Sequence, residues 1–345
     1  MSKVATIGAV KIGGKNPVRI KGMLKTPLKR IDDLIVEAQL LEKEGVEAIR
    51  IAVKDPACAK VCGVLKQYIR TPLVADIHFQ YKCAMAAIDE GFDSVRLNPL
   101  NVSKRCEIVE VAKYANKRKV SIRVGVNSGG FKKVFKTPAL QAKQMVDAVG
   151  KYLKILESVD FFNTMVSLKG ADVTTTILAN QIYSKRYDYP LHLGVTATGP
   201  YEQALIKSAI GVGSLLAQGI GNVIRISLSA PSYLEVKAAK DILQALDLRR
   251  FGPELISCPT CSRCEVNLID IVKRFEQELK ERNFTKPLKI AVMGCVVNGP
   301  GEACQADIGA AFGKGKAVIF RHDKIIGQSN DKDIIGDLLR EAKKL

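Results

Sequence analysis

The sequence contains no tryptophan and only three histidines among 345 residues. It has no apolar run close to the roughly 18 residues that a membrane-spanning helix needs, so we expect no membrane association. Its first residues hold only a short apolar stretch followed by lysines and glycines, which is not the pattern of a secretory signal. We therefore expect the chain to stay in the cytoplasm.

The sequence also lacks the patterns of disulfide-rich and dinucleotide-binding proteins. Its nine cysteines are an odd number spread through a long chain, which favours metal or redox use over a disulfide framework. No GxGxxG motif follows the first predicted strand, so the sequence does not favour an open sheet that binds a dinucleotide.

The formal net charge of +18 is compatible with nucleic acid, an anionic small substrate or an acidic protein partner. The lysines are scattered along the chain, and no helix-turn-helix or RNA-recognition motif is present. Without tryptophan, the chain also lacks one of the side chains that stack on bases. We therefore do not expect nucleic-acid binding as its main function.

Strand-like apolar runs recur about every 25 to 35 residues, each followed by an amphipathic helical stretch. The eight runs are residues 17–23, 47–53, 72–79, 93–99, 120–127, 164–170, 190–197 and 222–229. This alternation predicts an α/β fold with a TIM (β/α)8 barrel over residues 1–248. The preceding segment VATIGAVKIGG is predicted to form a hairpin that closes the bottom of the barrel. Residues 249–345 have a different pattern and predict a small α+β domain.

Polar residues gather in or just after the second half of these strands, where TIM barrels build their active sites. They are Arg50, Asp76, His78, Arg96, Asn98, Arg123, Asn127, Lys169, His192, Arg225 and Ser227. For His192, a hydrogen-bonded core position is an equal alternative. Converging cations repel one another unless an anion lies between them, and guanidinium groups match phosphate oxygens in pairs. The pattern therefore predicts a phosphorylated or diphosphorylated substrate.

The segment CPTCSRC places Cys258, Cys261 and Cys264 within seven residues, and GCVVNGPGEAC follows later with further donors. Zinc would suit four thiolates, with Cys295 and Cys304 completing the set. A ferredoxin-like cluster also begins with this spacing, but a fourth cysteine and a proline do not follow closely. A [4Fe-4S] cluster with three thiolates and one weaker donor is the third possibility. The remaining cysteines, at positions 58, 62, 83 and 106, are interpreted as buried apolar residues.

Several motifs together resemble one enzyme family. PLVADIHF, RLNP, IRVGVN, PLHLGVT, CPTCSR and GCVVNGPGEA are similar to those of the bacterial two-domain 4-hydroxy-3-methylbut-2-enyl diphosphate synthases, over nearly the whole chain. The resemblance implies a TIM barrel followed by a small iron–sulfur domain like those of sulfite and nitrite reductases. It also implies a homodimer, in which the cluster of one subunit closes over the barrel mouth of the other.

The implied reaction is the reductive ring opening and dehydration of 2-C-methyl-D-erythritol 2,4-cyclodiphosphate, with electrons from reduced ferredoxin or flavodoxin. The resemblance places the ligands of a [4Fe-4S] cluster at Cys258, Cys261, Cys295 and Glu302, which leaves Cys264 and Cys304 as extra cysteines. A carboxylate is an exchangeable donor on a thiolate-bound cluster, so Glu302 would leave its iron open to substrate.

The sequence departs from the family pattern at the barrel mouth. Ala197 stands where most members carry a glutamate associated with proton delivery, KGM replaces the usual QSM, and Leu100 replaces a glycine. Either His78, Asp76 or a water supplies the proton, or the chain is a divergent paralogue that reduces another phosphorylated substrate. A cluster-bearing RNA-binding protein without catalysis is a third hypothesis, which the presence of an exchangeable ligand at Glu302 disfavours.

Overall fold

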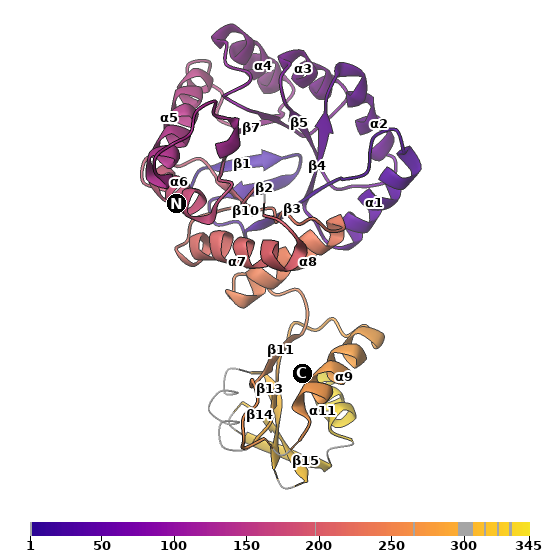
Figure 1. The fold of residues 1–345 in the computed structure, drawn as a ribbon. Coiled ribbons are helices and arrows are strands. Elements are labelled where there is room, and N and C mark those ends of the chain that lie inside the picture. Colours follow the sequence, from indigo (N-terminus) through magenta and orange to yellow (C-terminus); the bar gives the residue numbers. More distant parts are fainter. Residues whose placement is uncertain are drawn as a thin grey trace. The chain divides into compact units, whose positions relative to one another are not determined.

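The computed structural model describes residues 2–196, 198–264, 266–295, 306–313, 315–322, 324–330 and 333–345. The chain divides into two compact units, Met1–Arg249 and Arg250–Leu345 (Figure 1). Each unit has its own hydrophobic core, and each is described here by itself. No helix among the described residues is long and apolar enough to cross a membrane.

The first unit is a parallel eight-stranded barrel. Its strands are β3 (Arg19–Met23), β4 (Ala48–Val53), β5 (Leu73–Ile77), β6 (Ser94–Leu97), β7 (Ser121–Asn127), β8 (Thr164–Lys169), β9 (His192–Leu193) and β10 (Val223–Ile224). They follow the order β8-β7-β6-β5-β4-β3-β10-β9. A parallel bridge between Val166 of β8 and Leu191, just before β9, joins the two ends of this sheet into a ring.

Helices follow the strands and surround this ring (Figure 1). They are α1 (Ile31–Lys43), the short η1 (Pro56–Lys60) with α2 (Val61–Leu65), α3 (Tyr81–Asp89), α4 (Arg105–Lys117), η2 (Ser128–Gly130) with α5 (Pro138–Glu157), α6 (Val173–Ser184), α7 (Tyr201–Ala217) and α8 (Ser232–Ala245). Each long helix buries one stripe; in α4 this consists of Ile108, Val111, Ala112 and Ala115. Thr137 caps α5 and Asp172 caps α6 through hydrogen bonds from backbone N–H groups.

A hairpin closes one end of the barrel, as the sequence predicts. Strands β1 (Val4–Ile7) and β2 (Val10–Gly13) pair antiparallel and lie across the ring of strands in Figure 1. Their inner side chains share one core cluster with the beginnings of four barrel strands: Ala5, Ile7, Ile12, Ala48, Val74, Met165 and Val223. Because these barrel residues lie at the amino-terminal ends of their strands, the opposite, carboxyl end is left for a site.

The second unit is a five-stranded mixed sheet with two helices on one face. Its elements are β11 (Glu254–Ser257), α9 (Leu268–Glu281), β12 (Lys289–Met293), β13 (Ile308–Gly313), β14 (Lys316–Arg321), β15 (Lys324–Asn330) and α11 (Ile334–Lys343). Strands β11, β12 and β13 run parallel, and β14 and β15 continue antiparallel. Alternate residues of the sheet, such as Ile290 and Val292, pack with the apolar faces of α9 and α11 in one core.

The predicted α/β fold, a TIM barrel followed by a small second domain, is confirmed, and each predicted barrel run contains a strand. The seventh and eighth strands are shorter than predicted, but hydrogen bonding continues beyond them, from Arg225 N–H to Leu193 O at 3.1 Å. In α9, Ile271 is buried whereas Ile269 is 58% exposed.

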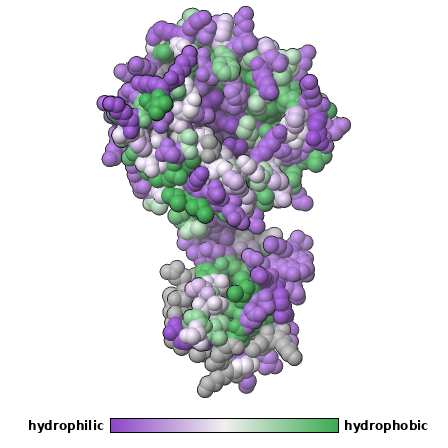
Figure 2. All heavy atoms as spheres, in the orientation of Figure 1, coloured by the Kyte–Doolittle hydropathy of each residue, from purple (hydrophilic) through white to green (hydrophobic). Residues whose placement is uncertain are grey.

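Hydrophilic side chains are spread over the visible face of the barrel unit and alternate with hydrophobic ones (Figure 2). This distribution agrees with the scattering of lysines along the sequence.

Candidate active site at the barrel mouth

Polar side chains from all eight barrel strands point into the barrel above the hairpin. They are Lys21 on β3, Arg50 on β4, Asp76 on β5, Arg96 on β6, Arg123 on β7, Lys169 at the end of β8, His192 on β9 and Arg225 directly after β10. We call these eight residues the mouth cluster. We call the barrel residues that share a core cluster with the hairpin, Ala48, Val74, Met165 and Val223, the plug layer. Arg50, Asp76 and Arg225 each follow a plug-layer residue by two positions, so they form the next layer toward the carboxyl ends of the strands.

Asp76 is the one carboxylate of the mouth cluster, and three basic side chains surround it. Its oxygens lie 3.9 Å from Nε of Arg50, 3.6 Å from Nη1 of Arg96 and 3.7 Å from Nε2 of His78. Burial by itself raises the pKa of Asp76, but Arg50, Arg96 and Arg123 outweigh it and lower the pKa to about 2. Asp76 therefore stays ionised at neutral pH and orients the guanidinium groups around it.

Arg123 and His192 form a buried pair on the other side of the barrel. Nη1 of Arg123 lies 2.6 Å from Nδ1 of His192, and both side chains are almost completely buried. Because a guanidinium only donates, Nδ1 must accept, and the imidazole proton is on Nε2. Burial first, then the neighbouring Lys169 and Arg123, lower the pKa of His192 well below its usual value. The ring is therefore neutral at physiological pH.

Two glycines make room for the longest side chains of the cluster. The Arg96 side chain lies over Gly125, where a Cβ would be 2.7 Å from its Nε, and Nη2 of Arg96 donates to Gly125 O at 2.8 Å. A Cβ at Gly194 would lie 2.6 Å from Nζ of Lys169. These close approaches give a physical reason for the glycines in the IRVGVN and HLGV segments.

Glu235 forms an ion pair with Arg225, the arginine that follows β10. This buried carboxylate on α8 lies 3.2 Å from Nη2 of Arg225 and 2.9 Å from Nζ of Lys25, and it accepts the N–H of Leu228 at 3.0 Å. Arg225 also donates to Ser227 Oγ at 2.6 Å. Sequence analysis did not identify Glu235; the signal was a glutamate among the buried positions of an otherwise apolar helix face.

Lys21 is a second member that sequence analysis did not place among the site residues. It lies in the middle of β3, is 3% exposed, and its Nζ has no hydrogen-bond partner among the described residues. Burial, followed by Arg123 and Arg50, lowers the pKa of Lys21 well below its usual value. The signal in the sequence was the KGM segment, which was noted as a departure from the family pattern at the mouth but not as a binding residue.

The cluster as a whole has an excess of positive charge and of free N–H groups. Its six lysines and arginines face the carboxylates of Asp76 and, behind Arg225, Glu235. Five of its side chains carry a buried N–H group without a hydrogen-bond partner in the described part of the chain: Lys21, Arg50, Arg123, His192 and Arg225. Since buried donors are nearly always paired in proteins, this arrangement calls for a ligand rich in acceptor oxygens and negative charge.

The other predicted mouth residues lie at the edge of the cluster. His78 follows β5 and its side chain is 45% exposed beside Asp76. Asn98 is buried just after β6 and accepts the N–H of Leu100 at 3.1 Å, so it shapes the turn. Asn127 ends β7 in register with Lys169. Ala197, where the sequence departs from the family pattern, lies outside the described residues.

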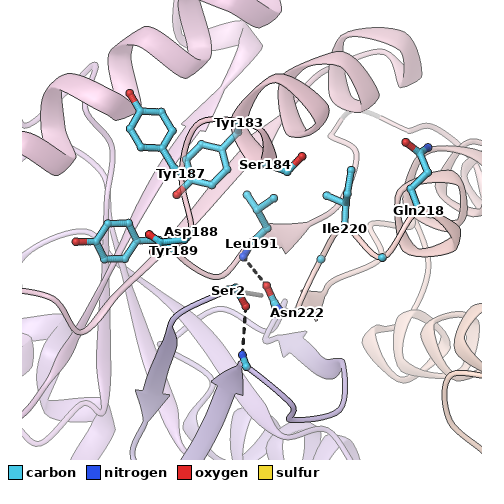
Figure 3. A pocket seen from close by; sticks show the side chains of 13 residues that line it. Ser2, Tyr183, Ser184, Tyr187, Asp188, Tyr189, Leu191, Gln218, Ile220 and Asn222 are labelled. Atoms are coloured by element: carbon cyan, nitrogen blue, oxygen red, sulfur yellow. Dashed lines mark hydrogen bonds between the residues drawn. The ribbon is translucent and has the colours of Figure 1, made fainter.

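A pocket of about 600 Å³ opens elsewhere, at the amino-terminal ends of β9 and β10 (Figure 3). It is lined by Tyr183, Tyr187, Leu191 and Asn222, with Ser2 from the hairpin side. None of the mouth-cluster residues lines it. We place the candidate site at the mouth, because TIM-barrel chemistry takes place at the carboxyl ends of the strands and the buried charges are found there.

Three of the predicted cluster ligands, Cys258, Cys261 and Cys295, lie in the second unit, near the ends of β11 and β12. The Gly294 N–H donates to Sγ of Cys258 at 3.3 Å, and a Cβ at Gly294 would lie 2.5 Å from Sγ of Cys264. The chain just before Cys295 therefore packs directly against the CPTCSRC segment. Backbone N–H donors beside soft thiols fit an iron–sulfur group, whose sulfurs accept such bonds.

Within the described residues, no group of three His, Cys, Asp and Glu side chains forms a site for a metal ion. The predicted fourth ligand, Glu302, and the extra Cys304 lie outside the described residues. The Cys264 thiol donates to Val266 O at 3.2 Å.

The interpretation of the barrel cysteines as buried holds for only two of them. Cys62 and Cys83 are buried, whereas Cys58 is half-buried and Cys106 is exposed. Cys106 begins α4 on its outer side, since the buried stripe of that helix starts two residues later at Ile108. Cys58 lies in η1, where its Sγ is 3.1 Å from Oδ2 of Asp55.

Comparison with known proteins matches both units to one family. The model described as the GcpE TIM-barrel domain matches residues 2–240, and that of the GcpE protein C-terminal domain matches residues 254–344. A protein of Thermodesulfovibrio yellowstonii named 4-hydroxy-3-methylbut-2-en-1-yl diphosphate synthase (flavodoxin) is 44% identical over 98% of this chain and 97% of its own. Proteins of the same name from Dehalococcoides mccartyi and Caldanaerobacter subterraneus are 42% and 41% identical, over 98% and 100% of this chain and 97% of each relative.

Solved structures share the barrel at low sequence identity. A type I 3-dehydroquinate dehydratase from Clostridium difficile superposes with a TM-score of 0.53 at 15% identity, covering 71% of this chain and 98% of that chain. A Yersinia pestis dihydropteroate synthase gives 0.53 at 12% identity over 71% and 97%. These two likenesses concern the fold alone. The family models and the full-length relatives agree with the resemblance drawn from the motifs: the chain belongs to the GcpE family of two-domain 4-hydroxy-3-methylbut-2-en-1-yl diphosphate synthases.

Proposed function

We propose that this protein converts 2-C-methyl-D-erythritol 2,4-cyclodiphosphate into 4-hydroxy-3-methylbut-2-enyl diphosphate. The reaction opens the ring, consumes two electrons and two protons, and releases one water. The observation that carries the proposal is the mouth cluster, in which four arginines and two lysines lie together and five side chains carry buried N–H groups without a hydrogen-bond partner in the described part of the chain. A cyclic diphosphate supplies the negative charge and the acceptor oxygens that this cluster lacks.

In this proposal the arginines bind and orient the diphosphate. Arg96 and Arg123 are held in place before the ligand arrives, by Gly125 O and by Nδ1 of His192. Arg225 is held by Glu235 in the same way. Because these groups are already fixed and desolvated, little reorganisation is needed when the anion binds, and its position in the mouth is well defined.

We assign the transfer of a proton to His78 and not to Asp76. The pKa of Asp76 is lowered to about 2, so this carboxyl has no proton to give near neutral pH. His78 lies at the open edge of the mouth with a 45% exposed side chain, and its Nε2 is 3.7 Å from Oδ2 of Asp76. Asp76 then acts by positioning His78, Arg50 and Arg96.

The redox part of the reaction is assigned to the second unit. A [4Fe-4S] cluster would be held there by Cys258, Cys261, Cys295 and Glu302, and it would supply electrons and Lewis acidity when bound. The Gly294 N–H that reaches Cys258 Sγ would support such a group by donating to its sulfur. The assignment of the four ligands follows the family motif and remains a proposal.

We also propose a reduced flavodoxin or ferredoxin as electron donor, a homodimer and a cytoplasmic location. The relatives' names specify flavodoxin. The formal charge of +18 would favour association with an acidic electron carrier. The homodimer and ferredoxin are what the resemblance to the family implies, and the cytoplasmic location is a prediction from the sequence pattern. Sedimentation of the purified holoprotein would test the first of these.

The direct test is product formation by the anaerobically purified holoprotein with the cyclodiphosphate and reduced flavodoxin. We expect multiple turnovers, and Arg123→Ala should abolish most of the activity. Arg118→Ala is a matched control, because Arg118 is exposed and pairs only loosely with Asp89 at 3.4 Å. The unmodified protein and Arg118→Ala should complement a strain that lacks the synthase, and Arg123→Ala should complement it poorly.

A different result would favour the divergent paralogue. If the holoprotein binds the cyclodiphosphate but forms no product, under conditions in which a known synthase turns over, the proposed reaction is wrong and the mouth accepts another phosphorylated substrate. If it neither binds nor converts the cyclodiphosphate, the anion site itself is wrongly assigned.

A further inference from the structure

Lys21 lies near the floor of the mouth cluster. Its backbone pairs in register with Ala48, a residue of the plug layer, whereas Arg50 lies two residues further along β4. The long side chain therefore rises from the floor toward the charges above it. It is 3% exposed, and its Nζ is a buried nitrogen without a hydrogen-bond partner in the described part of the chain.

The surroundings of Lys21 do not stabilise a fixed ammonium group. The charged groups that act on it are Arg123, Arg50, Lys169 and, with the opposite sign, Asp76. His192, which is itself affected by Lys21, is the remaining titratable neighbour and is neutral. Two guanidinium groups and a second buried lysine, Lys169, whose own pKa is lowered by burial and by the arginines, face one carboxylate. In this buried position the neutral amine of Lys21 is favoured in the free protein.

An anion above the cluster reverses this balance. A diphosphate introduces more negative charge than the carboxylate of Asp76 supplies, and it offers acceptor oxygens to a nitrogen that has none. A buried amine that lacks a partner contributes nothing to the stability of the free protein, and its desolvation has a cost. A buried lysine at position 21 is explained if the substrate supplies its hydrogen-bond partner.

We propose that Lys21 is a further anion-binding residue of the mouth, and that its amine takes up a proton as the diphosphate binds. This inference rests on the proposed function only in taking the ligand to be a diphosphate. It adds Lys21 as a binding group on the floor of the site, opposite its opening. The affinity for the diphosphate then depends on pH, because a proton is taken up from solvent when the diphosphate binds.

The test measures anion affinity and proton uptake together. Inorganic pyrophosphate is titrated into the full-length holoprotein in buffers of equal pH and different ionisation enthalpy, and the heat gives the number of protons taken up. Comparison with Lys21→Met cancels the proton exchange of pyrophosphate itself. We expect the variant to bind about 10- to 100-fold more weakly and to take up fewer protons, by up to one per chain.

Stability separates this role from a structural one. Because Lys21→Met removes an unpaired buried amine, the free variant should melt at the same temperature as the unmodified protein or higher. Lys104→Met, at a 75% exposed side chain, is the control and should leave affinity and proton uptake unchanged. Lys21→Gln provides a second variant, which keeps hydrogen-bonding capacity without the charge.

Three outcomes would overturn the inference. If both Lys21 variants bind pyrophosphate with unchanged affinity and unchanged proton uptake, while the unmodified protein binds it, Lys21 is not a ligand and the proposed reaction still stands. A lower melting temperature with unchanged binding would show that Lys21 serves the fold. If the unmodified protein does not bind pyrophosphate, both the inference and the anion site fail.

Discussion

Nη1 of Arg123 lies 2.6 Å from Nδ1 of His192 inside the barrel, and this pairing requires a neutral imidazole. A protonated ring would have a hydrogen on Nδ1, which would point at the guanidinium donor. The pair therefore couples the charge state of one histidine to the position of one arginine, and it makes the barrel sensitive to acid.

The pH dependence of stability should report this histidine. The pKa of His192 is lowered in the folded protein, so between that value and about 6.5 the unfolded chain binds more protons. The stability that the neutral ring allows is fully present above about pH 6.5 and is lost as the pH falls, by up to about 1.4 kcal/mol per pH unit. Urea unfolding of His192→Leu should show a flatter acid slope than the unmodified protein, and equal slopes would contradict the assignment.

Removal of one mouth arginine should weaken anion binding without unfolding the protein. Arg96→Ala or Arg123→Ala leaves phosphate oxygens without charge-assisted hydrogen bonds, and we expect a loss of about 2 to 4 kcal/mol. This corresponds to a dissociation constant for the cyclodiphosphate that is about 30- to 1000-fold larger. Calorimetric titration measures it, with Arg118→Ala as the surface control. Unchanged affinity in both mouth variants would remove the anion-site assignment.

Glu235 should be important for the stability of the barrel. Glu235→Ala leaves Arg225 without its buried partner, which typically costs about 3 to 5 kcal/mol of unfolding free energy. Glu107→Ala is the comparison, because Glu107 pairs with the exposed Lys104 and should contribute less than about 1 kcal/mol. Urea denaturation of both variants, followed by circular dichroism, decides the point. A Glu235 variant as stable as the Glu107 variant would show that solvent replaces the lost carboxylate.

The iron content of variants should identify the cluster ligands. Anaerobically purified protein should contain about four irons and four sulfides per chain, and Ser at Cys258, Cys261 or Cys295 should remove most of them. Cys264→Ser should retain the cluster, because the Cys264 thiol is engaged with Val266 O. Cys304→Ser should also retain it, as the family motif assigns Glu302 as the fourth ligand. Stoichiometric zinc in the protein would overturn the cluster assignment.

The proton donor can be tested at two positions. His78→Gln should reduce turnover by about 10²- to 10⁴-fold, the contribution of a positioned general acid. Adding Ala197→Glu restores a carboxyl at the position where most family members carry one, and it should recover part of the lost rate. The substrate affinity of His78→Gln should change little, which separates a chemical role from a binding role. Full activity of His78→Gln would assign the proton to another group.

Much of the fold was predictable because its signals are local. Each barrel strand is a short apolar run between helical segments, and the right-handed βα unit leaves few alternatives for such a repeat. The hairpin plug was visible as two short apolar runs around a glycine. The lengths of β9 and β10 were not predictable, since the same residues continue their hydrogen bonds without regular strand geometry.

The candidate site was predictable in its residues but not in their roles. Arginines and an aspartate at strand ends could be recognised from the sequence, and so could the cysteine motif. The neutral state of His192 and the ionised state of Asp76 could not, because both depend on charges from other strands that meet only in the closed barrel. Lys21 and Glu235 were missed for the same reason.

The sequence by itself determined the repeat of βα units, the family and the chemical types of the site residues, because these are properties of neighbouring residues along the chain. Only the tertiary structure decided which side chains share one buried space. The closed ring brings Lys21 of β3 within the field of Arg123 of β7 and Lys169 of β8, residues more than a hundred positions apart in the chain. Burial then removes the solvent that would have screened these charges, and the excess of cations becomes a site for an anion.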